Sequence, residues 1–94
     1  MALARVVTFE NVDSNRMAEL EQEMQSGDPP EGLEPQEIIV LHDPEASTST
    51  VILFFEDEEA YGRGDEVLNA MPSGDTPGQR TSVSKHDVRF RQSM

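Results

Sequence analysis

Two short apolar runs, residues 38–41 and 51–55, restrict the fold of this chain more than any other feature. They read IIVL and VILFF, and their β-branched and aromatic residues, bounded by Asp, Pro, Ser and Thr, are typical of strands. The polar residues 43–49 between them predict a hairpin. Neither run alternates apolar with polar residues, so we expect both faces of the sheet to be covered. A chain of 94 residues can cover one face with its own helices, and the other face then needs a partner.

A strand and a helix are expected before this hairpin. Residues 3–10 predict the first strand, which is apolar on both faces except at Arg5. Asp13 can cap a helix over residues 14–25, in which apolar side chains recur at helical spacing. Gly27 is placed to end that helix.

A second helix and a last strand are expected after the hairpin. The acidic residues 56–59 supply a cap and a first turn, and Pro72 ends the helix that follows. Gly62 and Gly64 inside this helix each cost about 1 kcal/mol relative to alanine, which predicts either a kink or a close packing contact. Residues 80–91 predict a strand whose polar residues on both faces suit a sheet edge or an intersubunit seam.

The element order is therefore strand, helix, strand, strand, helix, strand, the ferredoxin-like βαββαβ pattern. We expect a single α+β domain over residues 1–94, with an antiparallel sheet and both helices on one face. Because three of the four strands are apolar on the other, open face, we expect a second copy of the chain to cover it. The predicted assembly is a homodimer that forms a dimeric α+β barrel.

Charge and composition restrict the partners of this acidic protein. Nineteen acidic and seven basic residues give a net charge of −12, which repels phosphate backbones and anionic surfaces, so neither nucleic acid nor a membrane is an expected partner. The absence of cysteine excludes disulfides and thiolate metal sites. Residues 1–10 have neither a basic leader nor a cleavage site after them, so we expect a cytoplasmic protein. We also expect no cofactor and no metal.

The element order, the apolar open face and the long loop before the last strand resemble the dimeric α+β barrel superfamily, and within it the antibiotic-biosynthesis-monooxygenase-like group. The resemblance covers residues 3–91. It is carried by the segments Ala4–Phe9, Glu37–His42, Val51–Phe55 and Asp65–Pro72, none of which is a catalytic signature. It implies two sheets paired face to face, in a superfamily that contains cofactor-free oxygenases, haem-degrading enzymes, isomerases and proteins of no known activity.

The same resemblance implies a partial oxygenase site. The better-defined oxygenases of this superfamily use an Asn near the first strand, a Trp, and a His or Tyr near the second helix. Here Asn11 follows the first strand and Tyr61 lies early in the second helix, whereas the chain contains no tryptophan.

Arg5 is the most informative candidate site residue, because an arginine on an apolar strand needs a counter-charge or a ligand. It either pairs with an acid such as Glu37 or Glu56, or contacts an anionic or carbonyl-bearing molecule. Tyr61 and Asn69 are expected to line the space between the second helix and the sheet. The alternative to a binding role is that Tyr61 packs in the core with its hydroxyl hydrogen-bonded.

Two His–Asp pairs, at residues 42–43 and 86–87, are candidates for a general base or a metal site. The two pairs lie on strands that are not neighbours in the expected sheet, so a joint site would have to form across a dimer seam. The alternative is that both are strand-end residues with solvated imidazoles.

Two functions follow. The first is a homodimer that binds a small apolar or aromatic organic molecule through Arg5, Tyr61 and His86, as a cofactor-independent monooxygenase-like enzyme or as a binding protein. The second is a non-enzymatic interaction or regulatory protein whose sheet face serves only assembly. We expect Val51 and Leu53 at the dimer interface in either case.

Overall fold

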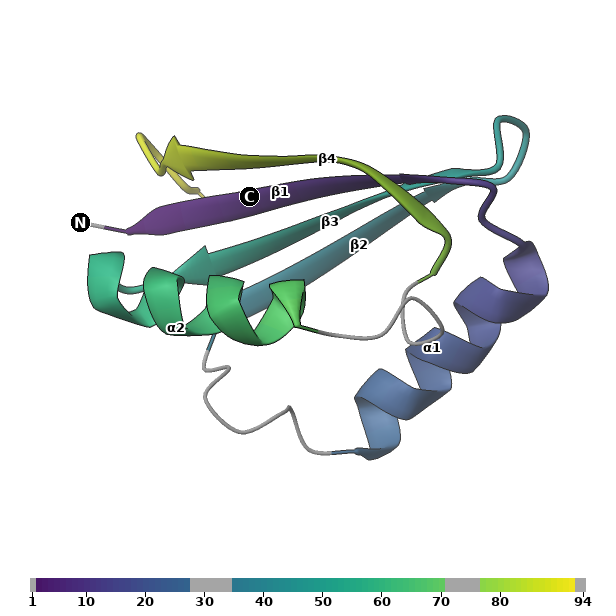
Figure 1. Cartoon of the computed structure of the whole chain (residues 1–94), viewed down its shortest axis with the longest axis horizontal. Coiled ribbons are helices and arrows are strands. Elements are labelled where there is room, and N and C mark those ends of the chain that lie inside the picture. The colour runs from purple at the N-terminus through teal and green to yellow at the C-terminus, as the bar shows by residue number, and fades with distance from the viewer. Residues whose placement is uncertain (1, 28–34, 71–76, 93–94) are drawn as a thin grey trace.

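The computed structural model describes residues 2–27, 35–70 and 77–92, which form a four-stranded antiparallel sheet and two helices (Figure 1). The elements are β1 (Leu3–Glu10), α1 (Ser14–Ser26), β2 (Glu37–Asp43), β3 (Thr48–Phe55), α2 (Glu58–Asn69) and β4 (Gln79–Asp87). The strands lie in the order β2-β3-β1-β4. This α+β arrangement is compatible with the expected ferredoxin-like pattern. Within these residues, neither helix is long and apolar enough to cross a membrane.

The register of the sheet separates its residues into two faces. Arg5 pairs with Leu53 and Lys85, whereas Ala4 pairs with His86. Directly paired residues of an antiparallel sheet point to the same side. We call the side of Arg5 the helix face; it comprises Leu3, Arg5, Val7, Phe9, Ile38, Val40, His42, Ser49, Val51, Leu53, Phe55, Arg80, Val83, Lys85 and Asp87. The other side is the open face; it comprises Ala4, Val6, Thr8, Glu10, Glu37, Ile39, Leu41, Asp43, Thr48, Thr50, Ile52, Phe54, Gln79, Ser82, Ser84 and His86.

Helix α2 packs on the helix face over β1 and β3 (Figure 1). It begins at the predicted acidic segment, where the Asp57 side chain accepts a hydrogen bond from the Ala60 N–H at 2.9 Å. Glu58 and Glu59 follow in the first turn, where the helix dipole favours negative charge. The helix then contributes one aromatic side chain to the main core, which consists of Leu3, Leu53, Phe55 and Tyr61. The predicted end of this helix at Pro72 lies outside the described residues.

Helix α1 contacts the same face mainly through its first turns. The predicted cap is confirmed, because the Asp13 carboxylate accepts a hydrogen bond from the Asn15 N–H at 2.8 Å. Met17 packs against a second core cluster, formed by Val7, Phe9 and Val12. Farther along the helix, 49% of Met24 is exposed. The apolar stripe of α1 is therefore only partly buried.

The last strand ends at Asp87, four residues before its predicted end. β4 is an edge strand, as its polar sequence indicated, and β1 is its one neighbour in the sheet. β1 begins at Leu3, which pairs with Asp87, and the Val88 N–H donates one further bond to the Ala2 carbonyl. Beyond this point β4 has no strand to pair with.

The expectation that Val51 and Leu53 lie at a dimer interface is wrong. Both point to the helix face, and Leu53 is 3% exposed within the main core. Ile52 and Phe54 occupy the open face instead. A run of five apolar residues has no alternation, so the sequence could not indicate which residues point to which face.

Helix α2 continues through both of its glycines, and Gly62 is exposed with open space where a Cβ would lie. We expect Gly62→Ala to raise the free energy of unfolding by about 1 kcal/mol, because alanine loses less backbone entropy in a helix. Urea denaturation measures this change. Gly78→Ala is the matched control and should destabilise, because its Cβ would meet the Glu10 carbonyl oxygen and lie 3.0 Å from Val12 Cγ2. A loss of stability in Gly62→Ala would contradict the continuous helix.

Candidate functional site

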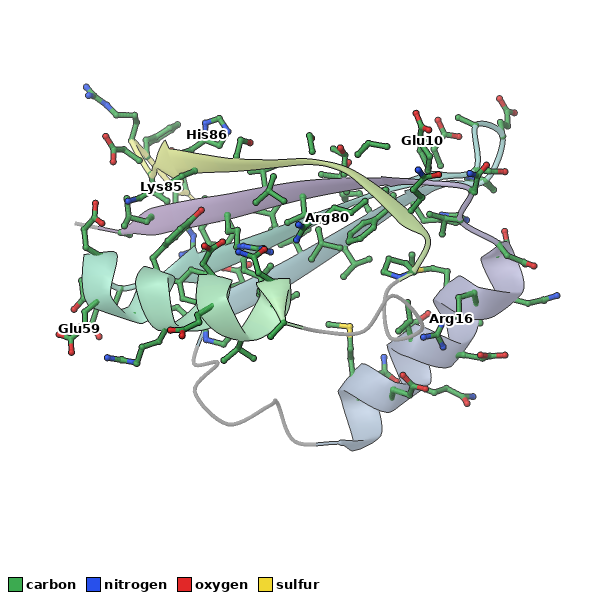
Figure 2. All side chains as sticks on the ribbon, in the orientation of Figure 1. Glu10, Arg16, Glu59, Arg80, Lys85 and His86 are labelled. Atoms are coloured by element: carbon green, nitrogen blue, oxygen red, sulfur yellow. The ribbon has the colours of Figure 1, made fainter. Side chains whose placement is uncertain are left out.

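Arg5 is the buried member of a polar cluster between β1 and α2 that reaches the surface. The residue is 2% exposed, its Nε donates to Asp65 Oδ1 at 2.8 Å, and its Nη2 donates to Asn69 Oδ1 at 3.1 Å. Asp65 and Asn69 are one helical turn apart and are joined by a 3.2 Å bond from Asn69 Nδ2 to Asp65 Oδ2. Arg80 of β4, labelled in Figure 2, donates to the same Asn69 oxygen at 2.8 Å. We call these four residues the Arg5 cluster.

Of the two roles expected for Arg5, the structure shows the pairing with an acid. The acid is Asp65, not Glu37 or Glu56. Glu37 lies on the open face and forms an ion pair with Arg91, and Glu56 is exposed after the end of β3. Asp65 faces β1 because α2 crosses the helix face beside Arg5. Sequence spacing alone could not reveal this crossing.

Tyr61 is enclosed by protein next to the Arg5 cluster. The residue is 7% exposed, and its ring packs edge-on against Phe55, with 5.5 Å between the ring centroids. Lys85 Nζ lies 5.0 Å from the Tyr61 ring centroid, where it is held by both carboxylate oxygens of Glu58 at 2.9 and 2.8 Å. Burial, and after it the Asp65 carboxylate, raise the pKa of the Tyr61 hydroxyl above its ordinary value.

His86 lies on the open face, away from Arg5 and Tyr61. Figure 2 shows its ring on the opposite side of β4 from Lys85, in agreement with the register. His86 Nε2 is 2.9 Å from the Ser84 hydroxyl on the same strand. The structure therefore brings Arg5 and Tyr61 together and does not bring His86 to them within one protomer.

The two histidines are also far from each other, because β2 and β4 are the two edges of the sheet. Neither has its sequence-adjacent aspartate as a hydrogen-bond partner, since neighbouring residues of a strand point to opposite faces. In residues 2–27, 35–70 and 77–92, no group of three or more His, Asp or Glu side chains is arranged to hold a metal ion.

An uncovered apolar patch occupies the middle of the open face. It consists of Val6, Ile39, Leu41 and Ile52, and no described helix packs over it (Figure 1). Leu41 is 54% exposed, and the other three residues are half-buried. The charged and titratable side chains of this face stand at its rim, at Glu10, Glu37, Asp43 and His86. An uncharged centre with a polar rim is the usual composition of a protein interface.

Several polar groups at both ends of the open face have partners within the chain. At one end, Thr8 Oγ1 lies 2.7 Å from Thr81 Oγ1 and 2.6 Å from Ser82 Oγ. At the other end, the Arg91 guanidinium lies 4.2 Å from the Phe54 ring centroid, where it also pairs with Glu37. These groups can be buried against a flat partner without losing their hydrogen bonds.

A scan against protein-family models finds no match, and a comparison with curated proteins finds none either. The fold places the chain among small α+β proteins that have a four-stranded antiparallel sheet and two helices. The likeness to the monooxygenase-like group is one of sequence pattern and element order.

The enclosure of Tyr61 has a consequence for pH dependence. Because its pKa is raised in the folded state, the unfolded chain releases this proton first, so the free energy of unfolding should fall as pH rises above about 10. Tyr61 is the one tyrosine of the chain, so tyrosinate absorbance follows it alone. We expect the pH titration of tyrosinate absorbance to have a higher midpoint in the folded protein than in the urea-unfolded protein. Equal midpoints would contradict the burial of the Tyr61 side chain.

Proposed function

We propose that this chain is an interaction protein that works as a homodimer, with the open faces of two copies packed together as in the dimeric α+β barrels. The observation that carries the proposal is the uncovered patch of Val6, Ile39, Leu41 and Ile52 on one side of the sheet. Water in contact with such a surface costs free energy in proportion to its apolar area, and association removes that contact.

The shape of the open face suits a second copy. Its four strands contain 7 to 9 residues each. At about 4.8 Å between strands and 3.3 Å per residue, the face measures roughly 19 by 25 Å. This projected area of about 475 Å² is somewhat below the lower bound for stable interfaces, about 600 Å² per partner. Another twisted sheet matches a sheet face of this kind and packs aligned within about 30°.

The charge distribution also favours this face over the others for self-association. Two copies with a net charge of −12 repel each other wherever their acidic surfaces meet. Helix α2 presents acids such as Glu58, Glu59 and Glu66, whereas the centre of the open face carries no charge. At the rim, Arg91 offsets Glu37. The open face is therefore a surface on which two such chains can approach at low electrostatic cost.

The enclosure of Arg5 and Tyr61 favours assembly over ligand binding as the main function. Both side chains are occupied by partners from their own chain. Binding of a small apolar or aromatic molecule, with monooxygenase-like chemistry, is the second hypothesis. It is supported by the exposed imidazole of His86, which would contact a molecule held between two copies.

Native mass spectrometry of the freshly purified protein tests both hypotheses in one spectrum. We expect a species at twice the 10.5 kDa chain mass. A dimer without an adduct supports assembly alone, whereas a dimer with a retained small molecule supports the second hypothesis. A monomer at micromolar concentration would contradict the proposed function.

A further inference from the structure

One histidine bridges two serines at the hairpin end of the sheet. His42 is half-buried on the helix face of β2, and its Nδ1 lies 3.0 Å from the hydroxyl of Ser49 on β3. Its Nε2 lies 3.2 Å from the hydroxyl of Ser14, the first residue of α1. Ser49 is 3% exposed, whereas Ser14 is exposed. One ring nitrogen is thus held by a buried group, and the other faces a hydroxyl that solvent can reach.

Two surface cavities lie at these residues. A cavity of about 140 Å³ is lined by Leu41, His42, Asp43, Thr48, Ser49 and Thr50. A second, of about 400 Å³, is lined by Asn11, Val12, Asp13, Ser14 and Ser47. Both are open to solvent; His42 and Ser49 line the first and Ser14 lines the second, so the Ser14–His42 contact lies where the two depressions adjoin.

The backbone beside Ser14 is strained. Asn11 and Ser47 both have φ of 55°, in the left-handed region that few residues other than glycine adopt. A 2.8 Å bond from the Val12 N–H to the Ser47 carbonyl joins the two strained segments. Such strain persists where the surrounding structure enforces it, and it is concentrated at functional sites.

We propose that Ser14 is a nucleophile that is acylated by small uncharged esters, with His42 as its general base and Ser49 as a positioning residue. In the tautomer that carries its proton on Nδ1, His42 donates to the Ser49 hydroxyl, which leaves Nε2 as the acceptor for the Ser14 proton. The arrangement has the nucleophile, base and orienting group of hydrolytic triads, with a hydroxyl in place of the carboxylate. Asp13 and Asp43 line the cavities and disfavour anionic substrates.

The reaction needs only the ester and water. Ser14 Oγ attacks the ester carbonyl while its proton passes to His42 Nε2. The carbon–oxygen bond to the alcohol then breaks, and the alcohol leaves with that proton. Water then attacks the acyl carbonyl while His42 Nε2 takes its proton. The bond from the acyl carbon to Ser14 Oγ breaks, His42 returns the proton to Ser14 Oγ, and the carboxylic acid leaves. Because a neutral hydroxyl stabilises an imidazolium less than a carboxylate does, turnover is slow and the acyl form accumulates.

Acylation by p-nitrophenyl acetate provides the first test. Intact mass followed by peptide mapping should locate one acetyl group on Ser14, and Ser14→Ala should abolish it. His42→Gln should slow acylation by about 100-fold or more, the usual contribution of a general base. Acylation at other residues with Ser14 unmodified would overturn the proposal, as would an unchanged rate in His42→Gln.

A single introduced cysteine provides a second test that does not depend on turnover or on dimer formation. The natural chain has no cysteine, so Ser14→Cys can be followed by iodoacetamide alkylation against pH. Asn15→Cys is the matched control, because it shares the first turn of α1 and not the His42 contact. We expect Ser14→Cys to react about 10-fold faster than Asn15→Cys at neutral pH, because His42 favours the thiolate.

A double variant tests the role of Ser49. Adding Ser49→Ala to Ser14→Cys should shift the pH dependence of the alkylation rate. Equal rates for the two cysteines would overturn the role of His42, and an unshifted profile would overturn that of Ser49.

Discussion

We expect Leu41→Asp to convert the proposed dimer into a folded monomer. Leu41 is 54% exposed in the protomer, so an aspartate there costs the single chain little. In a symmetric dimer, each copy would bury one unpaired carboxylate in the apolar patch, at a cost of several kcal/mol per pair of charges. Each 1.4 kcal/mol of binding free energy changes a dissociation constant tenfold. The dissociation constant of the dimer should therefore rise by about 1,000-fold or more.

Sedimentation equilibrium measures this change, and circular dichroism shows that the fold is kept. Val40→Asp is the matched control, because Val40 is on the same strand, is 36% exposed and points to the helix face. It should remain dimeric. If Leu41→Asp stays dimeric, or if Val40→Asp alone dissociates, the interface is not the open face.

Asp65→Ala should cause a large loss of stability. Arg5 would keep its buried guanidinium while losing the carboxylate 2.8 Å away. Breaking a buried ion pair costs 3–5 kcal/mol, and because 36% of the Asp65 side chain is exposed we expect about 3 kcal/mol, the lower end. This is a substantial share of the roughly 5–14 kcal/mol expected for a domain of this size.

A double substitution separates the cost of the unpaired charge from the value of the pair. Replacing Arg5 with Met together with Asp65→Leu removes both charges and keeps apolar volume between β1 and α2. We expect the double variant to be more stable than Asp65→Ala in urea denaturation, because no buried charge is left unpaired. A double variant as unstable as the single one would show that the cluster stabilises α2 by other means.

The elements of this fold could be predicted because their signals are local. Asp13 and Asp57 cap the two helices at the positions that the sequence indicates. The two apolar runs pair as an antiparallel hairpin. Each of these features depends on residues within a few positions of each other, so neighbouring side chains are sufficient to specify it.

The faces of the sheet and the partners of its polar residues could not be predicted, because they depend on contacts between distant segments. Arg5 pairs with Asp65, sixty positions away, through the path that α2 takes across the sheet. His42 contacts Ser14, twenty-eight positions away. The candidate couple of His42 with its neighbour Asp43 does not form, since consecutive residues of a strand point to opposite faces.

The most direct test of the proposed dimer is an isotope-filtered nuclear Overhauser measurement on a mixture of labelled and unlabelled protomers. Only contacts between two different copies give signals in this experiment. We expect intermolecular signals from the methyl groups of Ile39, Leu41 and Ile52 to those of the partner copy. Signals confined to Ile38 and Val40 on the helix face, or no intermolecular signal at all, would contradict assembly through the open face.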